Sequence, residues 1–264
     1  MIDCHSHILP GLDDGARNTK ACLDMCHRAI EDGVTHVIAT PHHGNGLYTT
    51  APETVQRMVD KLNDYITKQS LPLTIHPGCE AHLSPQLLES VEAGQTQTIC
   101  GGPYLLLELP VQELPIGLEQ FVFNLIVRDI QPIIAHPERI DAVQRNPEVL
   151  LSLVRSGALV QLTGMSITGE FGPEAQTCAE TLLTRRMVHI IASDAHSLNR
   201  RPPVLSEAVE AAAEILGSEA EAREMVFDIP ARVLRGEPFD PPTPFEVLPP
   251  PPKRGFWSFM RGFV

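Results

Sequence analysis

The sequence has few features of a secreted, membrane-spanning or disulfide-bonded protein. No apolar run in its 264 residues approaches the roughly 18 residues that a bilayer-spanning helix needs. Neither the basic nor the apolar region of a signal peptide occurs in its opening residues, MIDCHSHILPGLDDG. The six cysteines include no CxxC pair and are too sparse for a disulfide scaffold. We therefore expect a cytoplasmic protein with reduced thiols.

Basic side chains are also scarce. The chain has 20 lysines and arginines against 33 acidic residues, a formal net charge of −13 with neutral histidines. An acidic surface repels phosphate backbones unless bound cations change the local sign, so we expect no nucleic-acid partner. With 43% hydrophobic residues and a mean hydropathy of −0.03, the chain can bury a full core, which excludes a disordered protein.

Seven short apolar runs recur along the chain, each ending in polar or small residues. Their starts lie 27 to 38 positions apart, close to the ~30 residues of a strand with its crossover helix. Runs that are apolar at nearly every position are typical of parallel strands covered on both faces. The predicted strands are MIDCH from 1, THVIAT from 35, LTIHPG from 73, YLLLEL from 104, QPIIAH from 131, ALVQLT from 158 and VHIIAS from 188.

Helical periodicity fills the segments between these runs. Seven strand-helix units predict an α/β fold with a closed or nearly closed barrel. A doubly wound open sheet is the alternative, because periodicity does not reveal closure. The predicted helices cover 17–32, 53–69, 116–128, 146–156, 174–186 and the Ala- and Glu-rich region 203–235.

The C-terminal stretch differs in kind, so we expect the barrel domain to end at 237. Residues 238–252 contain 8 of the chain's 24 prolines, which favours an extended linker. Residues 253–264 (KRGFWSFMRGFV) are basic and aromatic, a composition that fits weak contact with an anionic membrane surface or a partner protein. The alternatives are a tail folded back onto the barrel or a disordered one.

Ligand-type side chains stand at the ends of six of the seven runs. In parallel α/β folds the active site forms outside the carboxyl ends of the strands, so these side chains should converge. H-x-H and D-x-H pairs put two ligands on one face of an extended segment. Nine ligands are too many for one tetrahedral site, and imidazole with carboxylate suits two or three Zn, Mn or Fe(II) ions. The nine candidates are His5, His7, Asp14, His42, Glu80, Glu108, His136, Asp194 and His196.

Other histidines and acidic residues lack such clustering. A lone histidine is more often structural than a ligand, and an aspartate near a turn can support a ligand instead of binding the metal. We interpret His27, His36, His76, His82 and His189 as structural, leave His43 undecided, and interpret Asp3 and Asp13 as turn or ligand-supporting residues.

Two arginines follow predicted ligands closely. Arg139 comes three residues after His136, and Arg200 or Arg201 follows His196. A guanidinium fork is the usual clamp for a phosphate or carboxylate, so the pattern predicts an anionic substrate. One arginine of the 200–201 pair is interpreted as a surface residue.

One combination of motifs is more specific than any of its members: MIDCHSH, DDG at 13–15, ATPHH, a Glu closing the third run, LLLELP, IIAHPER, and ASDAHS followed by RRPP. In this combination the chain resembles the polymerase-and-histidinol-phosphatase (PHP) superfamily. Within it, the sequence is most similar to bacterial metal-dependent protein tyrosine phosphatases of capsule and exopolysaccharide loci. The resemblance covers residues 1 to about 240.

This resemblance implies a single-domain, distorted TIM-like (β/α)7 barrel with up to three divalent ions, manganese first and iron or zinc as alternatives. Carried onto this chain, one ion is held by His5, His7 and Asp194, Glu80 bridges two, Glu108 and His136 complete the second, and Asp14, His42 and His196 hold the third. Arg139 and Arg201 match the family's phosphate-binding arginines.

The resemblance also implies a reaction, the hydrolysis of phosphotyrosine on the tail of a bacterial tyrosine autokinase. The short strand-end loops favour such a protein substrate over a small molecule such as histidinol phosphate, the alternative within the superfamily. A metal-binding scaffold without hydrolytic activity is a further alternative, against which the complete set of ligands and arginines argues.

Overall fold

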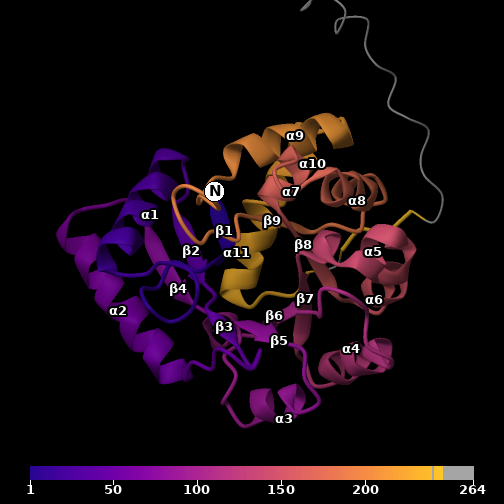
Figure 1. Ribbon diagram of the computed structural model, residues 1–264, viewed down its shortest axis with the longest axis horizontal. Coiled ribbons are helices and arrows are strands. Elements are labelled where there is room, and N and C mark those ends of the chain that lie inside the picture. The colour runs from indigo at the N-terminus through magenta and orange to yellow at the C-terminus, as the bar shows by residue number, and fades with distance from the viewer. Residues whose placement is uncertain (240, 246–264) are drawn as a thin grey trace, which may run out of the picture.

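The computed structural model describes residues 1–239 and 241–245. Every strand pair in its two sheets is parallel, with the orders β1-β2-β4 and β3-β5-β6-β7-β8-β9 (Figure 1). The predicted parallel α/β fold is therefore confirmed. The strands are β1 (Ile2–Ser6), β2 (His36–Ala39), β3 (His42–His43), β4 (Thr74–Pro77), β5 (Glu80–His82), β6 (Tyr104–Glu108), β7 (Gln131–Ala135), β8 (Leu159–Thr163) and β9 (Ile190–Ala192).

In the described part of the chain, nine strands form instead of the seven predicted because a second, short strand directly follows two of the predicted runs. Pro41 separates β2 from β3, and Pro77 ends β4 shortly before β5 begins. A proline has no N–H to donate, so the hydrogen-bond ladder breaks where it stands. The ladder resumes at once, since the Glu80 N–H donates to the Pro41 carbonyl at 3.1 Å.

The first and last strands also meet through the backbone. Ser6 and Ala195 form a parallel bridge. The Asp194 N–H donates to the His5 carbonyl at 2.9 Å, and the His7 N–H donates to the Ala195 carbonyl at 2.8 Å. Residues almost 190 positions apart in sequence therefore lie side by side at the carboxyl ends of their strands.

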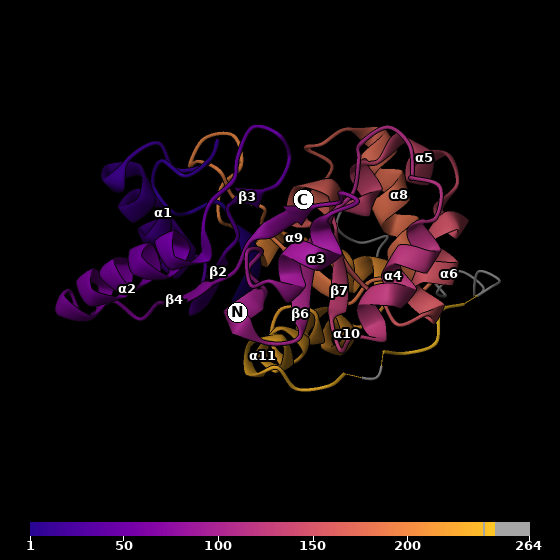
Figure 2. The ribbon, with the colours of Figure 1, turned by 90° about the horizontal axis from the view of Figure 1, so that it is seen from below.

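Helices cover the sheets in two groups. Helices α1 and α2 accompany the three-stranded sheet, while α4, α5, α6 and α8 lie at the other end of the molecule beside the six-stranded sheet (Figure 2). The helices are α1 (Thr19–Glu31), α2 (Pro52–Lys68), α3 (Leu87–Glu92), α4 (Leu118–Ile126), α5 (Asp141–Arg145), α6 (Leu151–Arg155), α7 (Gly164–Thr168), α8 (Pro173–Thr184), α9 (Ser206–Leu216), α10 (Glu219–Glu224) and α11 (Asp228–Arg235), with short 3-10 turns η1 (Ile99–Gly101), η2 (Pro137–Arg139) and η3 (Pro147–Leu150).

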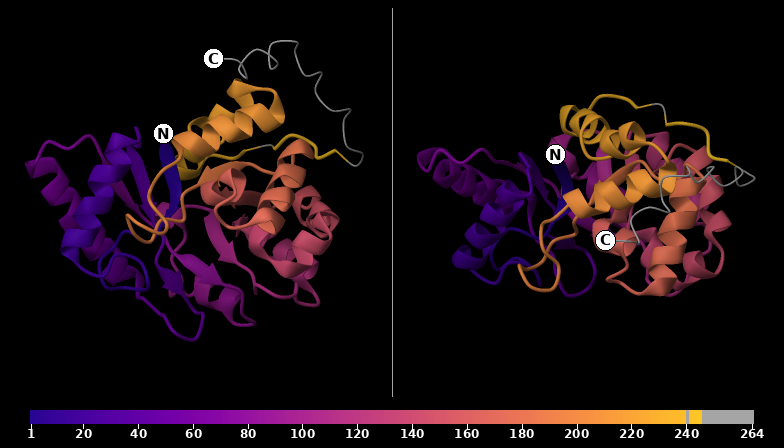
Figure 3. Two further views of the ribbon diagram at one scale, coloured as in Figure 1. Left: turned by 45° about the horizontal axis from the view of Figure 1, so that its top comes forward. Right: turned by 90° about the horizontal axis from the view of Figure 1, so that it is seen from above.

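The predicted closing helical region, 203–235, consists of three helices, α9, α10 and α11. Gly217 adopts a left-handed conformation (φ 66°) that ends α9, and the Ser218 side chain then accepts the N–H of Glu221 to begin α10. The end of this region lies against the first strand, since α11 contacts β1 and the Ile2 N–H donates to the Val226 carbonyl at 2.8 Å. Figure 3 shows the orange and yellow closing helices near the N-terminus.

The described part of the proline-rich stretch contacts the body of the protein. Residues 241–245 form neither helix nor strand. The Phe245 N–H donates to the Arg185 carbonyl at 2.8 Å, and the Arg186 guanidinium lies 5.0 Å from the Phe245 ring centroid. The predicted tail, 253–264, lies outside the described residues. Within the described chain, none of the helices combines the length and apolar character needed to cross a bilayer.

Candidate metal centre

The nine predicted ligands come together at the carboxyl ends of the strands. Each has a ligand-type atom within 3.7 Å of another member's. Gly15 allows the loop after β1 to reach the cluster, because a Cβ there would lie 2.1 Å from the His7 carbonyl oxygen. The contributing positions are His5 in β1, His7 and Asp14 after it, His42 in β3, Glu80 in β5, Glu108 at the end of β6, His136 after β7, and Asp194 and His196 after β9.

The rings of His5 and His7 are oriented by partners on their outer nitrogens. His5 Nδ1 lies 2.9 Å from Oε1 of Gln161, and His7 Nδ1 lies 2.7 Å from Oδ2 of Asp13. Both partners are acceptors, so in the neutral rings the proton sits on Nδ1 and the Nε2 atoms carry lone pairs. These two Nε2 atoms lie 3.1 Å apart. Two lone pairs aimed at one point are the arrangement expected of ligands to a shared cation.

Glu80 lies at the middle of the cluster and is completely buried. Its Oε1 is 2.7 Å from His136 Nε2, and its Oε2 is 2.8 Å from His42 Nδ1. Neither Oε2 nor this Nδ1 has a hydrogen-bond partner within the described residues. Because buried polar atoms are normally paired, the unpaired contact fits a position for a cation. The donor set, imidazole and carboxylate without thiolate, suits divalent ions such as Mn, Fe or Zn.

Asp14, His42 and His196 form the outer part of the cluster. His196 donates from Nδ1 to the Asp194 carbonyl at 2.9 Å, which leaves its Nε2 lone pair 3.4 Å from Oδ1 of Asp14. His42 Nε2 lies 3.5 Å from the same oxygen. When His196 is protonated, its hydrogen bond with Asp14, together with the charges of His42 and His7, holds the pKa of the Asp14 carboxyl far below its usual value. The carboxylate is therefore ionised throughout the physiological range.

Three overlapping groups of ligand atoms lie within 4.8 Å of one another: His7, Asp14, His42 and His196; His5, His7 and Glu80; and His42, Glu80 and Glu108. His42 belongs to two of them because each of its ring nitrogens faces a different carboxylate. Asp194 adjoins the middle group, with Oδ1 at 3.3 Å from His5 Nε2 and 3.4 Å from His7 Nε2. The arrangement can hold more than one divalent ion.

The cluster atoms that could hold a cation also bind protons. Burial alone would lower the pKa of His7, but its bonds to Asp13, Asp194 and Glu80 raise it well above the usual value. Burial alone would raise the pKa of Glu80, but the neighbouring histidines His5, His136 and His42 lower it well below. Bound protons must leave the imidazoles before a cation can bind them, so cation affinity here depends on pH.

Arg139 and Arg201 converge on one oxygen of Asp194. Their Nη1 atoms lie 2.6 and 2.9 Å from Oδ2, and Nη2 of Arg201 lies 2.9 Å from Nε2 of His196. The Phe171 ring lies beneath the Arg139 guanidinium, 4.6 Å from the ring centroid to Cζ. Both arginines thus border the cluster and remain partly exposed, where they can bind an anion.

Two members of the cluster have strained backbones. His136 (φ 34°) and Asp194 (φ 51°) occupy the left-handed region that non-glycine residues rarely adopt. Such conformations persist only where the surroundings enforce them, and they concentrate at functional sites. At both positions the unusual backbone turns the chain directly after a strand, where the side chain joins the cluster.

One histidine interpreted as structural has a partner in the cluster, a contact that the sequence interpretation did not include. His82 ends β5 with Nδ1 3.1 Å from Oε2 of Glu108. The signal was its spacing, because residues two apart in a strand share a face and Glu80 is a cluster member. Gln161 lies in β8, the strand that carries no predicted ligand, and it orients His5.

The remaining sequence interpretations agree with the structure. His189 is buried and accepts the Val160 N–H, while His36 and His76 pair with each other at 3.0 Å. The undecided His43 faces the Thr50 carbonyl, and His27 is exposed on α1. Asp13 supports His7, and Asp3 accepts hydrogen bonds from Ser193.

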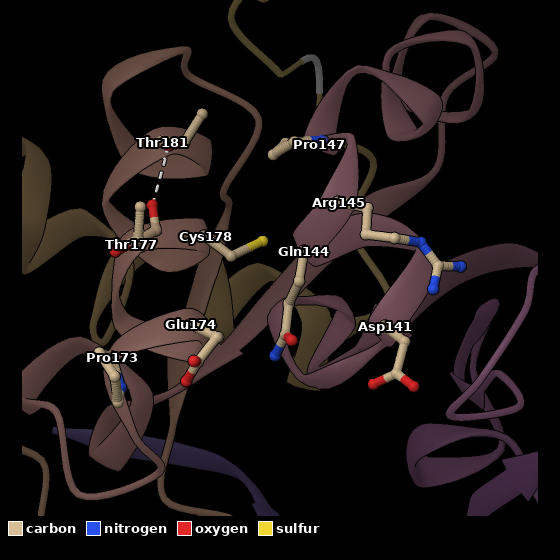
Figure 4. Close-up of a pocket in the computed structure, with 9 residues that line it drawn as sticks. All are labelled: Asp141, Gln144, Arg145, Pro147, Pro173, Glu174, Thr177, Cys178 and Thr181. Atoms are coloured by element: carbon tan, nitrogen blue, oxygen red, sulfur yellow. Dashed lines mark hydrogen bonds between the residues drawn. The ribbon is translucent and has the colours of Figure 1, made fainter.

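Two cavities lie at different distances from this chemistry. One of about 580 Å³ adjoins the cluster, with Asp14, His196 and Arg201 among its lining residues. Another of about 610 Å³ lies between α5 and α8 (Figure 4) and shares no residue with the cluster. The cavity that shares residues with the cluster is therefore the one from which a ligand can reach it.

The fold and the site together define a class: parallel α/β proteins that carry a histidine–carboxylate cluster, suited to metal ions, at the carboxyl ends of their strands. Within this class the chain belongs to the family described as "Capsular polysaccharide synthesis, CpsB/CapC", whose model matches residues 1–235.

Named relatives agree with this membership. The chain is 35% identical to the tyrosine-protein phosphatase YwqE of Bacillus subtilis (strain 168), over 83% of this chain and 86% of the relative. It is 33% identical to the putative tyrosine-protein phosphatase CapC of Staphylococcus aureus, over 78% and 81%. It is 27% identical to the tyrosine-protein phosphatase CpsB of Streptococcus pneumoniae, over 89% and 98%.

Solved structures resemble the fold. One comes from a crystallographic study of YwqE from Bacillus subtilis and CpsB from Streptococcus pneumoniae, described as unique metal-dependent tyrosine phosphatases. It matches with a TM-score of 0.89 at 33% identity, covering 94% of this chain and 99% of that one. A β-aspartyl dipeptidase from Fervidobacterium islandicum AW-1, with a TM-score of 0.55 at 17% identity and coverage of 90% and 74%, shares the fold alone.

Proposed function

We propose that the protein is a metal-dependent protein tyrosine phosphatase that hydrolyses phosphotyrosine on a bacterial tyrosine autokinase and so regulates capsule or exopolysaccharide synthesis. Family membership and the names of the relatives support the reaction class. The observation that carries it is the meeting of the His5 and His7 lone pairs beside the buried Glu80, next to two partly exposed arginines.

We also propose that the seven strand positions form a distorted (β/α)7 barrel over residues 1–237, followed by a linker (238–252) and a tail (253–264). The backbone bridge between β1 and β9 supports near-closure, and α11 ends at Arg235. In this arrangement the nine cluster residues would hold three divalent ions, manganese in the first place. Divalent ions bound there would supply activation of water and Lewis-acid stabilisation of phosphoryl charge.

The protein's own groups then do three things. Arg139 and Arg201 orient the phosphoryl group, because a guanidinium matches two phosphate oxygens at once and stabilises charge that grows in the transition state. Phe171 restricts the Arg139 guanidinium to one plane. The buried carboxylate of Asp194 fixes both arginines at the same edge of the cluster. The departing phenolate is a stable enough anion that the reaction does not depend on a strong acid.

The test removes the metal by chelation and restores single ions while phosphate release is measured. We expect chelation to abolish hydrolysis of a phosphotyrosine peptide and one divalent ion to restore it. The same assay with histidinol phosphate separates the alternatives, since preference for the small molecule would contradict a protein substrate. Tightly bound metal without chelator-sensitive hydrolysis would identify a scaffold.

A further inference from the structure

We propose that the cavity beside the cluster is a subsite for a second anionic side chain of the substrate, held by Arg17 and Arg200. The ligand chemistry is a carboxylate or a second phosphotyrosine a few residues from the one being hydrolysed. This inference rests on the proposed phosphatase function and deepens it, because it assigns a preference among phosphotyrosine sequences.

The cavity connects directly with the reaction site. Asp14, His196 and Arg201 line one part of it, and Arg17 and Arg200 line another. Its volume of about 580 Å³ lies in the range of pockets that hold small ligands, roughly 300–1,000 Å³. An extended peptide advances by about 3.3 Å per residue, so a side chain near the phosphotyrosine would reach this cavity.

Arg17 and Arg200 have no competing partner. Among the described residues, neither guanidinium forms a hydrogen bond or ion pair, and both side chains are exposed. Several other arginines outside the cluster are engaged, such as Arg128 with Glu92 at 2.7 Å. Two unpaired guanidinium groups in one cavity can offer forked donors to an incoming carboxylate or phosphate.

The remaining charges of the cavity favour an anion. The N-terminal end of α1 adds partial positive charge, since Ala21 in its first turn lines the cavity. Asp24 also lines it, but its Oδ2 pairs with Lys20 Nζ at 2.6 Å. Asp14 is the other carboxylate, and it faces His42 and His196 in the cluster. Because Asp24 is paired with Lys20 and Asp14 belongs to the cluster, Arg17 and Arg200 are the cationic side chains of the cavity lining that remain free for an anion.

The experiment measures binding without turnover. Three labelled peptides carry a non-hydrolysable phosphonate analogue of phosphotyrosine, flanked by neutral residues, by glutamates, or by a second phosphonate. Fluorescence anisotropy gives Kd for the metal-loaded wild type and for the double variant Arg17→Gln/Arg200→Gln. The matched control is Lys61→Gln/Lys68→Gln, which removes two positive charges from the exposed face of α2.

We expect the wild type to bind one or both acidic peptides about tenfold more tightly than the neutral one, a difference that corresponds to roughly 1.4 kcal/mol. The arginine variant should lose this preference, the lysine control should keep it, and Arg17→Lys/Arg200→Lys should recover part of it. The glutamate and diphosphonate peptides show which anion the subsite takes. Equal binding of all three peptides by the wild type, or a preference that survives in the arginine variant, would overturn the proposal.

Failure of the proposed function has a different signature. In that case the wild type releases no phosphate from the corresponding phosphotyrosine peptides, whatever their flanks. The phosphonate binding series still reports on the cavity, so the two outcomes are separable.

Discussion

The carboxylate of Asp13 holds the imidazole of His7 in one orientation, with Oδ2 2.7 Å from Nδ1. The same carboxylate accepts backbone N–H groups from Gly15 at 2.9 Å and His42 at 3.1 Å, so it links the loop after β1 to the start of β3. Burial alone would raise the pKa of Asp13, but the bond with His7 and these N–H groups lower it. Asp13 therefore controls which nitrogen of His7 faces the cluster.

We expect Asp13→Asn to weaken metal binding by about 10- to 100-fold, because a neutral amide accepts the His7 Nδ1–H more weakly than a carboxylate does and makes the ring a poorer ligand. Metal titration followed by calorimetry measures the change, and saturating metal should restore much of the activity. Asp60→Asn, on the exposed face of α2, is the matched control. An unchanged metal Kd would show that the Asp13 bond has no influence on the cluster.

Replacing Arg139 by lysine tests the need for a planar fork. Lysine keeps the charge but cannot donate two parallel bonds or stack on Phe171 in the same way. We expect kcat/KM for a phosphotyrosine peptide to fall by about 10²-fold, or roughly 2.7 kcal/mol. Arg145→Lys, on the exposed side of α5, should behave like the wild type. Equal loss in both variants would point to a general effect on folding.

Metal removal should lower stability as well as activity. A divalent ion present at 100 times its Kd adds about 2.7 kcal/mol to the free energy of unfolding, provided that the unfolded chain does not bind it. For a protein of this size, that corresponds to a rise in Tm of roughly 5–10 °C. Scanning calorimetry of the chelated protein with and without added metal measures it. A Tm independent of metal concentration would contradict binding to the folded cluster.

We expect the protein to lose stability in mild acid because the buried His189 becomes protonated. Burial lowers its pKa from 6.5 to about 4, and its Nδ1 accepts the Val160 N–H at 3.0 Å, which requires the neutral ring. The unfolded chain binds this proton more readily than the folded chain does. The stabilisation that the neutral, buried His189 provides is therefore fully present above pH 6.5 and is lost as the pH falls towards 4. This pKa shift can change the free energy of unfolding by at most roughly 3 kcal/mol.

Chemical denaturation of the chelated protein at several pH values tests this. The variant His189→Gln should show a flatter fall in unfolding free energy between pH 6.5 and 4 than the wild type does. His27→Gln, which changes an exposed histidine on α1, should leave the slope as it is. Identical slopes in wild type and His189→Gln would contradict the assignment.

The strands and the meeting of their ends could be predicted because both depend on local patterns. Each apolar run specifies a buried parallel strand, and parallel strands place their carboxyl ends at one edge. Pairs such as His5 with His7 follow from the two-residue repeat of an extended chain. The breaks at Pro41 and Pro77 were visible in the sequence as residues without an N–H, although their effect on the ladder depends on which strand lies alongside.

The partners within the cluster could not be predicted, because they depend on how separate loops approach one another. His42 faces Asp14 with one ring nitrogen and Glu80 with the other, a position set by the turn after Pro41. His82 seemed isolated because its partner, Glu108, lies on the neighbouring strand, 26 residues later. Gln161 orients His5 across 156 residues of sequence, and neither residue type nor spacing announces such a pair.

The bridge between β1 and β9 determines when the site can exist during synthesis. Asp194 and His196 are synthesised nearly 190 residues after His5 and His7, and so is Ser193 after Asp3, whose carboxylate accepts the Ser193 hydroxyl at 2.5 Å. Contacts of such sequence separation form late in folding. A nascent or truncated chain therefore cannot assemble the complete cluster, and full metal loading reports that both ends of the fold have been made and joined.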